Sequence, residues 1–487
     1  MLTTILIVLP LAAALVVWVV PMPREWAGGL AFVTAFAEVG LWVGGAARFD
    51  YGGGLQLDAR RAWFSDLGVS YHVGFFGFSL WLAGLTVVVC ALAIAYGVWA
   101  ERERSRAYFG LMLFLTGSIV GVFAAQDLLL FSAFFEGMLI PLYVLVGVWG
   151  GPRRATATLL FVIYTVAGSM LMLASIVAFG ISQGTFSLVD SGTSSNDWIF
   201  LGFAVAFAVK SPLVPFHGWL RTAYTEASPE VSAILSGVVS KAAVYGFVRI
   251  CLPKFPEPVD DFRTTILVLA AAGLAYGSLL AFRQPDLRGV VAYSSLGQMS
   301  LIVLGIFASS QTGLDGAVLH SVNHGLVSAA MFLFAGFVER SYGSGEFARL
   351  GGAAKGRPLL ATILMTAGMF TLAVPGSSNF AGEFLILAGV FRQGWGYSVV
   401  GAVAIVLAAM YTLRLISAVL HERRGAAVPA ADEAPDLQGD QLFIVVPLLA
   451  CLLALSVWPN AVSGHAFPRP FASGAWSAYP QPAEPAP

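Results

Sequence analysis

The residues of this sequence that could do chemistry are charged side chains placed inside strongly apolar stretches. Glu136 stands in FFEGMLIPLY, Lys210 in AFAVKSPL, Lys241 in SGVVSKAAVYG and Glu383 in SSNFAGEFLI. A charged side chain at the centre of a bilayer costs roughly 2.5 to 3.5 kcal/mol on insertion scales, so each of these residues needs a partner, water or a purpose. Four such charges predict a polar path through a membrane rather than isolated structural pairs.

Two histidines and an arginine extend this set. His320 and His324, in VLHSVNHGLV, are four residues apart and therefore share one helix face. Because histidine titrates near neutral pH, it can relay a proton between Lys241 and Glu383. No third ligand accompanies the pair, so we expect no metal there. Arg414, in MYTLRLIS, is interpreted as a fixed counter-charge, since a guanidinium does not release its proton.

The composition describes a membrane protein over its whole length. Of 487 residues, 58% are hydrophobic and only 11% are charged, and the mean hydropathy is +0.81. The net charge of -1 gives no basic surface for nucleic acid. Its three cysteines are far apart in sequence, so they form neither a metal-binding pattern nor a disulfide framework, and we expect no cofactor in this chain.

The elements that must position these residues are membrane-spanning helices. Apolar stretches of about 20 residues recur between turn-rich or charged breaks and predict an all-α polytopic protein of about fourteen crossings. The predicted spans are 2–20, 28–47, 74–99, 107–125, 127–148, 155–181, 198–226, 229–251, 262–282, 288–308, 313–338, 359–391, 396–420 and 442–459. The segments 48–73 and 421–441 are the main predicted loops, and the tail after Asn460 is expected to be irregular.

Two of these stretches are predicted to be broken inside the membrane. Pro212 and Pro215 follow Lys210 in stretch seven, and Pro375 precedes Glu383 in stretch twelve. Paired broken helices in the two halves of a chain indicate inverted repeats with an ion site at the break. His217, beside the first break, is a possible accessory residue or an ordinary hydrogen-bonded one.

The basic residues predict the orientation. More Lys and Arg adjoin the connections after odd-numbered helices, which places both termini on the non-cytoplasmic side. At span ends, snorkelling to the interface would accommodate Asp127 and Arg249. We expect Glu38 either in a functional site or near lipid headgroups. Surface positions are expected for His72, His421 and His465.

Several segments together resemble one known family. They are FFEGMLIPLYVLVGVWGGPRR, AFAVKSPLVPFHGWL, SKAAVYGFVR, YSSLGQM, NHGLVSAAMF and VPGSSNFAGEF, within about 75–420. The chain resembles subunit M of the proton-pumping NADH:quinone oxidoreductase, respiratory complex I. The EGMLIPLY segment favours M over the related L and N subunits, as does Glu383, where those relatives usually have lysine. A subunit of an Mrp-type cation/proton antiporter or of a membrane-bound hydrogenase is the alternative, and a membrane scaffold locked by its charges is a second one.

The resemblance implies a fourteen-helix subunit with two inverted five-helix repeats. It implies N-terminal helices in 1–106, a first repeat in 107–251, a second in 262–420, and a loop, last helix and tail in 421–487. Glu136 would pair with Lys210, Lys241 would be the central lysine, His320 and His324 would belong to the polar axis, and Glu383 would be the terminal proton site.

The implied partners are L-type and N-type neighbours, protons and the lipid bilayer of a bacterial plasma membrane. One departure from the family pattern follows Trp219-Leu220, where the chain reads Arg221-Thr222-Ala223-Tyr224 instead of a segment that usually contains histidine. We therefore expect a different proton entry region.

Overall fold

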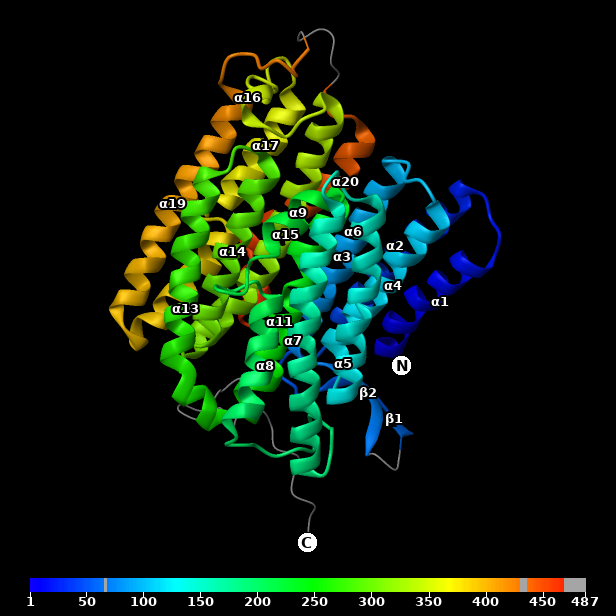
Figure 1. Ribbon diagram of the computed structural model, residues 1–487, viewed down its shortest axis with the longest axis vertical. Coiled ribbons are helices and arrows are strands. Elements are labelled where there is room, and N and C mark those ends of the chain that lie inside the picture. Colours follow the sequence, from blue (N-terminus) through cyan, green and yellow to red (C-terminus); the bar gives the residue numbers. More distant parts are fainter. Residues whose placement is uncertain (65–67, 430–435, 468–487) are drawn as a thin grey trace.

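The fold is a bundle of helices that run roughly parallel to one long axis (Figure 1). The computed structural model describes residues 1–64, 68–429 and 436–467. In those residues, twelve helices are long and apolar enough to cross a membrane. The two remaining predicted crossings are the interrupted ones, so the expectation of about fourteen crossings with the seventh and twelfth broken is confirmed.

The N-terminal part contains a feature that hydropathy did not predict. Helices α1 (Leu2–Val19) and α2 (Arg24–Ala46) are followed by the antiparallel strands β1 (Gln56–Phe64) and β2 (Val69–Phe75), and then by α3 (Gly77–Trp99). The segment 48–73 was expected to be a loop only. Alternation of apolar and polar residues over these short strands is weak, and the hairpin is held by contacts with distant residues instead.

The first group of five crossings surrounds the first break. It consists of α4 (Ser105–Ala124), α5 with α6 (Leu128–Gly137 and Leu139–Trp149), α7 (Arg154–Gln183), the broken pair α8 and α9 (Asp197–Lys210 and Leu220–Glu226), and one crossing made of five short pieces. Those pieces are α10 (Pro229–Ile234), η2 (Leu235–Val239), α11 (Lys241–Gly246), η3 (Phe247–Cys251) and α12 (Leu252–Lys254). Both η2 and η3 are π-helical turns, which in α-helices often mark functional sites.

The second group repeats this order of elements. It consists of α13 (Pro256–Arg283), α14 (Leu287–Ile306), α15 (Gln311–Tyr342), the broken pair α17 and α18 (Pro358–Thr371 and Ser378–Val390), and α19 (Trp395–Leu420). The short α16 (Phe347–Leu350) and the 3-10 turn η4 (Phe391–Gln393) lie in its connections. Helices α20 (Gly439–Val457) and α21 (Asn460–Ser463) follow, and the expected irregular tail lies largely outside the described residues.

The two ends of the bundle can be told apart by their connections. The hairpin end carries β1, β2, the α4–α5 turn and residues 184–196, which are joined by backbone hydrogen bonds. The opposite end carries the α3–α4 and α13–α14 turns and α16 (Figure 1). The membrane-spanning parts of the crossing 229–254 and of α15 are completely buried inside the protein. By contrast, α1, α2, α13 and α19 each expose apolar side chains along one face, where lipid could contact them. Lys241, His320 and His324 therefore lie on the innermost helices, whereas Arg414 lies on the partly exposed α19.

Candidate proton axis

The centre of the candidate site is Lys241, a fully buried lysine near the middle of the crossing 229–254. Its Nζ donates to the Ser236 carbonyl at 2.7 Å and to Ser240 Oγ at 3.3 Å, and it lies 2.8 Å from Nδ1 of His324. The π-helical turn before Lys241 lets the Ser236 carbonyl accept from this side chain five residues later. Lysine and histidine are thus in direct hydrogen-bond contact, as a proton relay requires.

Two glycines bring these residues together. A Cβ atom built on Gly325, beside His324, would lie 2.6 Å from the Gly237 carbonyl oxygen, and one built on Gly237 would lie 3.0 Å from the Gly325 oxygen. Only residues without a side chain allow such close backbone contact, which is how small residues bring membrane helices together. The sequence at this crossing therefore fixes the distance between Lys241 and His324.

A line of polar side chains continues from His324 to Glu383. The rings of His324 and His320 are 6.4 Å apart between centroids, one turn along α15. His320 Nε2 lies 2.6 Å from Gln298 Oε1, and Gln298 Nε2 donates to Glu383 Oε1 at 3.2 Å. Glu383 is buried on α18, where Gly382 lets that helix approach His320 closely. The prediction that Lys241, the two histidines and Glu383 form one group is consistent with this geometry.

The axis is not a closed, fully paired network. Within the described residues, Glu383 Oε2 and His320 Nδ1 are buried and have no hydrogen-bond partner. Buried polar atoms are normally satisfied by protein groups or water, so these two atoms mark places for water.

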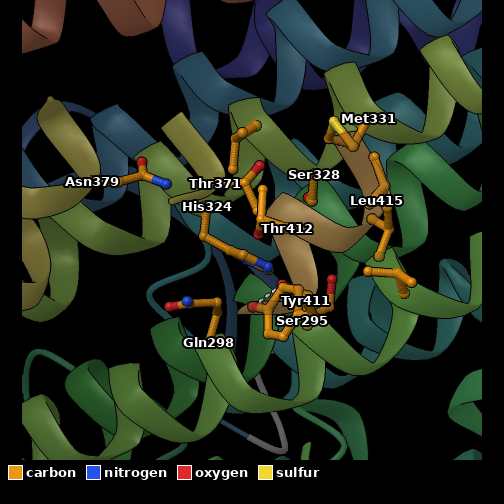
Figure 2. A pocket seen from close by; sticks show the side chains of 14 residues that line it. Ser295, Gln298, His324, Ser328, Met331, Thr371, Asn379, Tyr411, Thr412 and Leu415 are labelled. Carbon is orange, nitrogen blue, oxygen red and sulfur yellow. Dashed lines mark hydrogen bonds between the residues drawn. The ribbon is translucent and has the colours of Figure 1, made fainter. Parts of the chain in front are cut away.

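A small cavity, with a volume of about 20 Å³, adjoins the axis between α14, α15, α17 and α19 (Figure 2). Polar side chains lining it include Ser295, Gln298, His324 and Tyr411, whose hydroxyl is 2.8 Å from Ser294 Oγ. Figure 2 shows the His324 ring and the Tyr411 ring converging on the same space. Such a lining gives water the two to four polar partners that it requires.

The other predicted charge pair is not in direct contact. In the described part of the chain, no ion pair joins Glu136 to Lys210. The Lys210 ammonium instead lies 4.9 Å from the ring centroid of Phe135 and 5.9 Å from that of Phe161, and Glu136 Oε1 is buried without a partner. Cation–π contacts hold the lysine at the helix break, close to the carboxylate but separate from it.

The two accessory candidates lie away from the axis. The ring of His217 packs edge-on against Tyr276, with centroids 5.2 Å apart, and its buried Nδ1 has no partner among the described residues. Arg414 donates to the carbonyl oxygens of Phe282 and Gln284 at the opposite end. Of the altered segment, Arg221 binds Gln284 and Asp286 at that same end.

Several polar residues at the site were not predicted. Gln298 bridges the histidines to Glu383, and Ser236 is 2.7 Å from Ser295 across two buried helices. Toward the opposite end of the same crossing, Glu230 on α10 is fully buried and accepts from Arg102 Nε at 2.6 Å and Nη2 at 2.8 Å. The signal that could have found Gln298 is its one-turn spacing from Ser294 and Ser295 in an otherwise apolar stretch.

A polytopic bundle with a buried lysine, two histidines and a glutamate in line defines an antiporter-like membrane protein. Residues 125–410 match the family described as the NADH:quinone oxidoreductase/Mrp antiporter transmembrane region. NADH-quinone oxidoreductase subunit M of Mycobacterium tuberculosis is 34% identical over 94% of this chain and 91% of its own. The chain therefore belongs to the subunit M family of NADH-quinone oxidoreductase.

Solved structures agree with this membership. A chain of respiratory complex I from Thermus thermophilus with bound NADH has a TM-score of 0.87 and 27% identity, and the match covers 96% of this chain and 98% of that one. A chain of the Mrp complex from a Dietzia species has a TM-score of 0.84 at 23% identity, covering 95% and 96%, and shows the fold alone. The chain is an integral membrane protein of a multi-subunit membrane arm.

Proposed function

We propose that this chain translocates protons as a membrane-arm subunit of an NADH:quinone oxidoreductase, through Lys241, His324, His320 and Glu383. The observation that carries the proposal is the line of contacts from Lys241 Nζ to Glu383 Oε1 through buried helices. Quinone reduction itself takes place in other subunits. The chain contributes a path whose groups change protonation when the charges beside them move.

The geometry gives each residue a role in this path. The Lys241 ammonium donates toward His324 Nδ1, so a proton can pass from lysine to histidine along an existing hydrogen bond. Water between the two rings, one helical turn apart, would carry it to His320. Gln298 cannot itself hold the proton, but it orients both His320 and Glu383. We therefore treat Gln298 as a positioning residue.

In this proposal, Lys210 and Glu136 couple quinone reduction in the other subunits to proton transfer along the axis. Two unit charges interact by about 1 kcal/mol at 4 Å in water and several times more in a protein, so a move of Lys210 changes the field at neighbouring titratable groups. The absence of a direct ion pair among the described residues leaves Lys210 held mainly by aromatic rings. It can then approach or leave Glu136 without breaking a buried salt bridge.

The proposed inverted repeats, 107–251 and 262–420, are supported by two matching connections. In the first, Asp127 begins α5, Leu128 N donates to the Phe186 carbonyl and Leu188 N to that of Gln126. The second has Asp286 at the start of α14, Leu287 N bonded to Gly345 and Phe347 N to Pro285.

The same difference in residue number separates each residue of the first connection from its counterpart in the second. It also separates Gly184 from Gly343, which are both left-handed with φ +67°. The first connection lies at the hairpin end and the second at the opposite end. This relation supports the proposal that the two groups of helices are inverted repeats.

The surroundings of the axis favour entry from the opposite end. From Lys241, the hydrogen bond to Ser236 leads to Ser295, which lines the cavity of Figure 2. One turn before Ser236, the Ser232 hydroxyl donates to the Tyr224 carbonyl at 2.8 Å. The basic residues near this end, such as Arg102 and Arg153, make it the cytoplasmic one in our proposal, with both termini outside and the bilayer that of a bacterial plasma membrane.

We also propose that this subunit lies between L-type and N-type relatives in the membrane arm. The relatives named subunit M support a place in the complex I membrane arm, and this chain is 34% identical to one of them but 23% identical to the Mrp chain. The antiporter alternative is therefore less favoured.

The experiment that tests the proposed function uses Glu383. In the whole complex, reconstituted in sealed vesicles, E383A and E383Q should oxidise NADH with quinone but pump fewer protons per NADH. The ratio falls because neither side chain releases a proton at the end of the axis. An unchanged ratio in both variants, in a complex that retains this subunit, would contradict the proposal.

A further inference from the structure

Two arginines, Arg249 buried and Arg414 partly buried, lie on the last crossing of the two groups of helices. Arg249 lies on η3, eight residues after Lys241, and Arg414 lies on α19, three residues after Tyr411. Each is on the last crossing of its group, near the connection that begins the second crossing of the same group. The two arginines thus lie at opposite ends of the protein.

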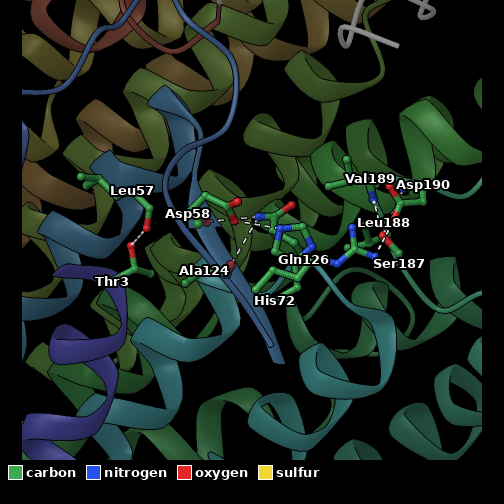
Figure 3. A network of polar contacts seen from close by, with 12 residues as sticks. Thr3, Leu57, Asp58, His72, Ala124, Gln126, Ser187, Leu188, Val189 and Asp190 are labelled. Atoms are coloured by element: carbon green, nitrogen blue, oxygen red, sulfur yellow. Dashed lines mark hydrogen bonds and ion pairs between the residues drawn. The ribbon is translucent and has the colours of Figure 1, made fainter. Parts of the chain in front are cut away.

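At the hairpin end, Arg249 donates to two neutral groups among the described residues. It donates from Nε and Nη2 to Gln126 Oε1, at 3.1 and 2.9 Å, and from Nη2 to the Leu188 carbonyl at 3.2 Å. The ring of Phe76 lies 4.9 Å from its guanidinium carbon. Figure 3 shows Gln126 between the hairpin residue His72 and Leu188, so the arginine is anchored where β2, the α4–α5 turn and residues 184–196 meet.

Burial of this arginine corrects the expectation for its neighbourhood. Arg249 is 3% exposed and Asp127 is fully buried, whereas both were expected to snorkel to the interface. His72, expected at the surface, is also buried and lies 2.8 Å from Asp58 Oδ1 (Figure 3). The hairpin covers this end of the bundle, so the guanidinium is separated from water.

Arg414 is held at the opposite end in the same manner. It donates to the carbonyl of Phe282 and, at 3.0 Å, to that of Gln284. Its guanidinium carbon lies 5.7 Å from the ring centroid of Phe282 and 5.4 Å from that of Phe347. Gln284 Oε1 in turn accepts from Arg221 Nε at 2.8 Å. Again carbonyl oxygens and aromatic rings fix the cation.

The offset that relates the two connections also relates the groups that hold the two arginines. Leu188, whose carbonyl accepts from Arg249, corresponds to Phe347, whose ring lies beside Arg414. Ala125 corresponds to Gln284: the carbonyl of Ala125 accepts from Tyr245, one turn before Arg249, and that of Gln284 accepts from Arg414 itself. The two arginines therefore lie near matching connections at opposite ends, but their acceptors differ: Gln126 and Leu188 for Arg249, Phe282 and Gln284 for Arg414.

We infer that Arg249 and Arg414 are charge barriers, each of which blocks proton leakage at one end of the polar axis. The inference rests on the proposed function, since only a proton path needs such barriers. A guanidinium keeps its positive charge at all usable pH and cannot pass a proton on. Fixed cations of this kind exclude protons from water-filled membrane pores.

The position of each arginine fits this role. At a rise of about 1.5 Å per residue, Arg249 lies about 12 Å beyond Lys241 toward the hairpin end. Lys254 lies beyond it toward the same end, where its Nζ donates to the Ser191 carbonyl at 2.6 Å. Arg414 lies one turn beyond Tyr411, which lines the cavity beside His324. Protons on the axis therefore move across the bundle from Lys241 to Glu383, and the two arginines keep them from leaving along either group of helices.

The test measures passive proton leakage through the whole complex in sealed vesicles, without NADH. We compare R249Q, which keeps hydrogen-bonding groups but loses the charge, with R249K, which keeps the charge. A unit charge about 12 Å from the proton changes the rate of passage about tenfold at an effective dielectric constant of about 20. We expect R249Q to leak about ten times faster than the wild type, R249K to stay close to wild type, and R414Q to leak as R249Q does.

A double variant separates this inference from the proposed function. If the leak runs along the axis, K241M combined with R249Q should return it to the wild-type level. An assembled R249Q complex as tight as wild type, or a leak that persists in the double variant, would overturn the inference. Should R249Q fail to assemble, R414Q decides by the same criterion. Normal pumping in K241M alone contradicts the proposed function instead, whatever the leak measurements show.

Discussion

Gln298 offers the sharpest test of the polar axis, because among the described residues it alone joins His320 to Glu383. Its Oε1 is 2.6 Å from His320 Nε2, and its Nε2 is 3.2 Å from Glu383 Oε1. Replacement by leucine, of similar size, removes both contacts. Each buried polar atom left without a partner costs about 1 to 3 kcal/mol. If one such cost adds to the barrier for proton transfer, the rate along the axis falls about 5-fold to 150-fold.

The assay is the number of protons pumped per NADH oxidised by the reconstituted complex. We expect Q298L to lower this ratio by the whole share of this subunit, because transfer that slow cannot keep pace with turnover. Q298E is the matched control, since its carboxyl group can accept from His320 and, when protonated, donate to Glu383. It should pump better than Q298L. A Q298L complex that pumps as well as wild type would refute the idea that this amide positions the path.

Two further predictions follow from contacts near the axis. H324A should reduce the pumping ratio less than loss of Lys241 does, because water can replace the imidazole next to the cavity while the lysine keeps its bond to Ser236; a vesicle pumping assay with both variants checks the order. E230Q should lower the melting temperature of the complex, because it weakens the buried bidentate pair with Arg102, and breaking such a pair costs about 3 to 5 kcal/mol. The control is E101Q, which removes one partner of the exposed pair between Arg24 and Glu101. An unchanged melting temperature in E230Q would show that the buried pair adds no stability.

The energetic cost of burying charge made much of the site predictable. Lys241 and Glu383 were identified because a charge inside an apolar stretch is expensive, and the structure buries both beside the predicted histidines. Proline in stretch seven and Pro375 in stretch twelve likewise predicted the two broken crossings, because proline removes a helical hydrogen bond. A local sequence pattern therefore predicted a feature correctly where a single residue costs a large free energy inside a membrane helix.

Other features depend on tertiary contacts that no local pattern records. Gln298 is uncharged, so its cost in a membrane helix is small and gave no comparable signal. The π-helical turns around Lys241 and the close approach of Gly237 to Gly325 arise from packing against α15. The hairpin that buries Arg249 was interpreted as a loop for the same reason: its strands are stabilised by residues far away in the sequence.

The direct partner of Lys210 could not be predicted from residue types. Opposite charges in neighbouring helices suggest an ion pair, yet in the described residues Lys210 lies over the rings of Phe135 and Phe161. Residue type specifies that a lysine needs stabilisation, whereas helix rotation decides which groups supply it. The proposed coupling to Glu136 remains a prediction for mutagenesis.

The central claim is that Lys241 passes protons and is more than a buried positive charge. The most direct measurement is the ratio of protons pumped to NADH oxidised for K241R beside K241M, in complexes shown to contain this subunit. Arginine keeps the charge but holds its proton, and methionine removes both. The account predicts that both variants lose the proton contribution of this chain. Full pumping in K241R would contradict it, because the residue would then act only through its charge.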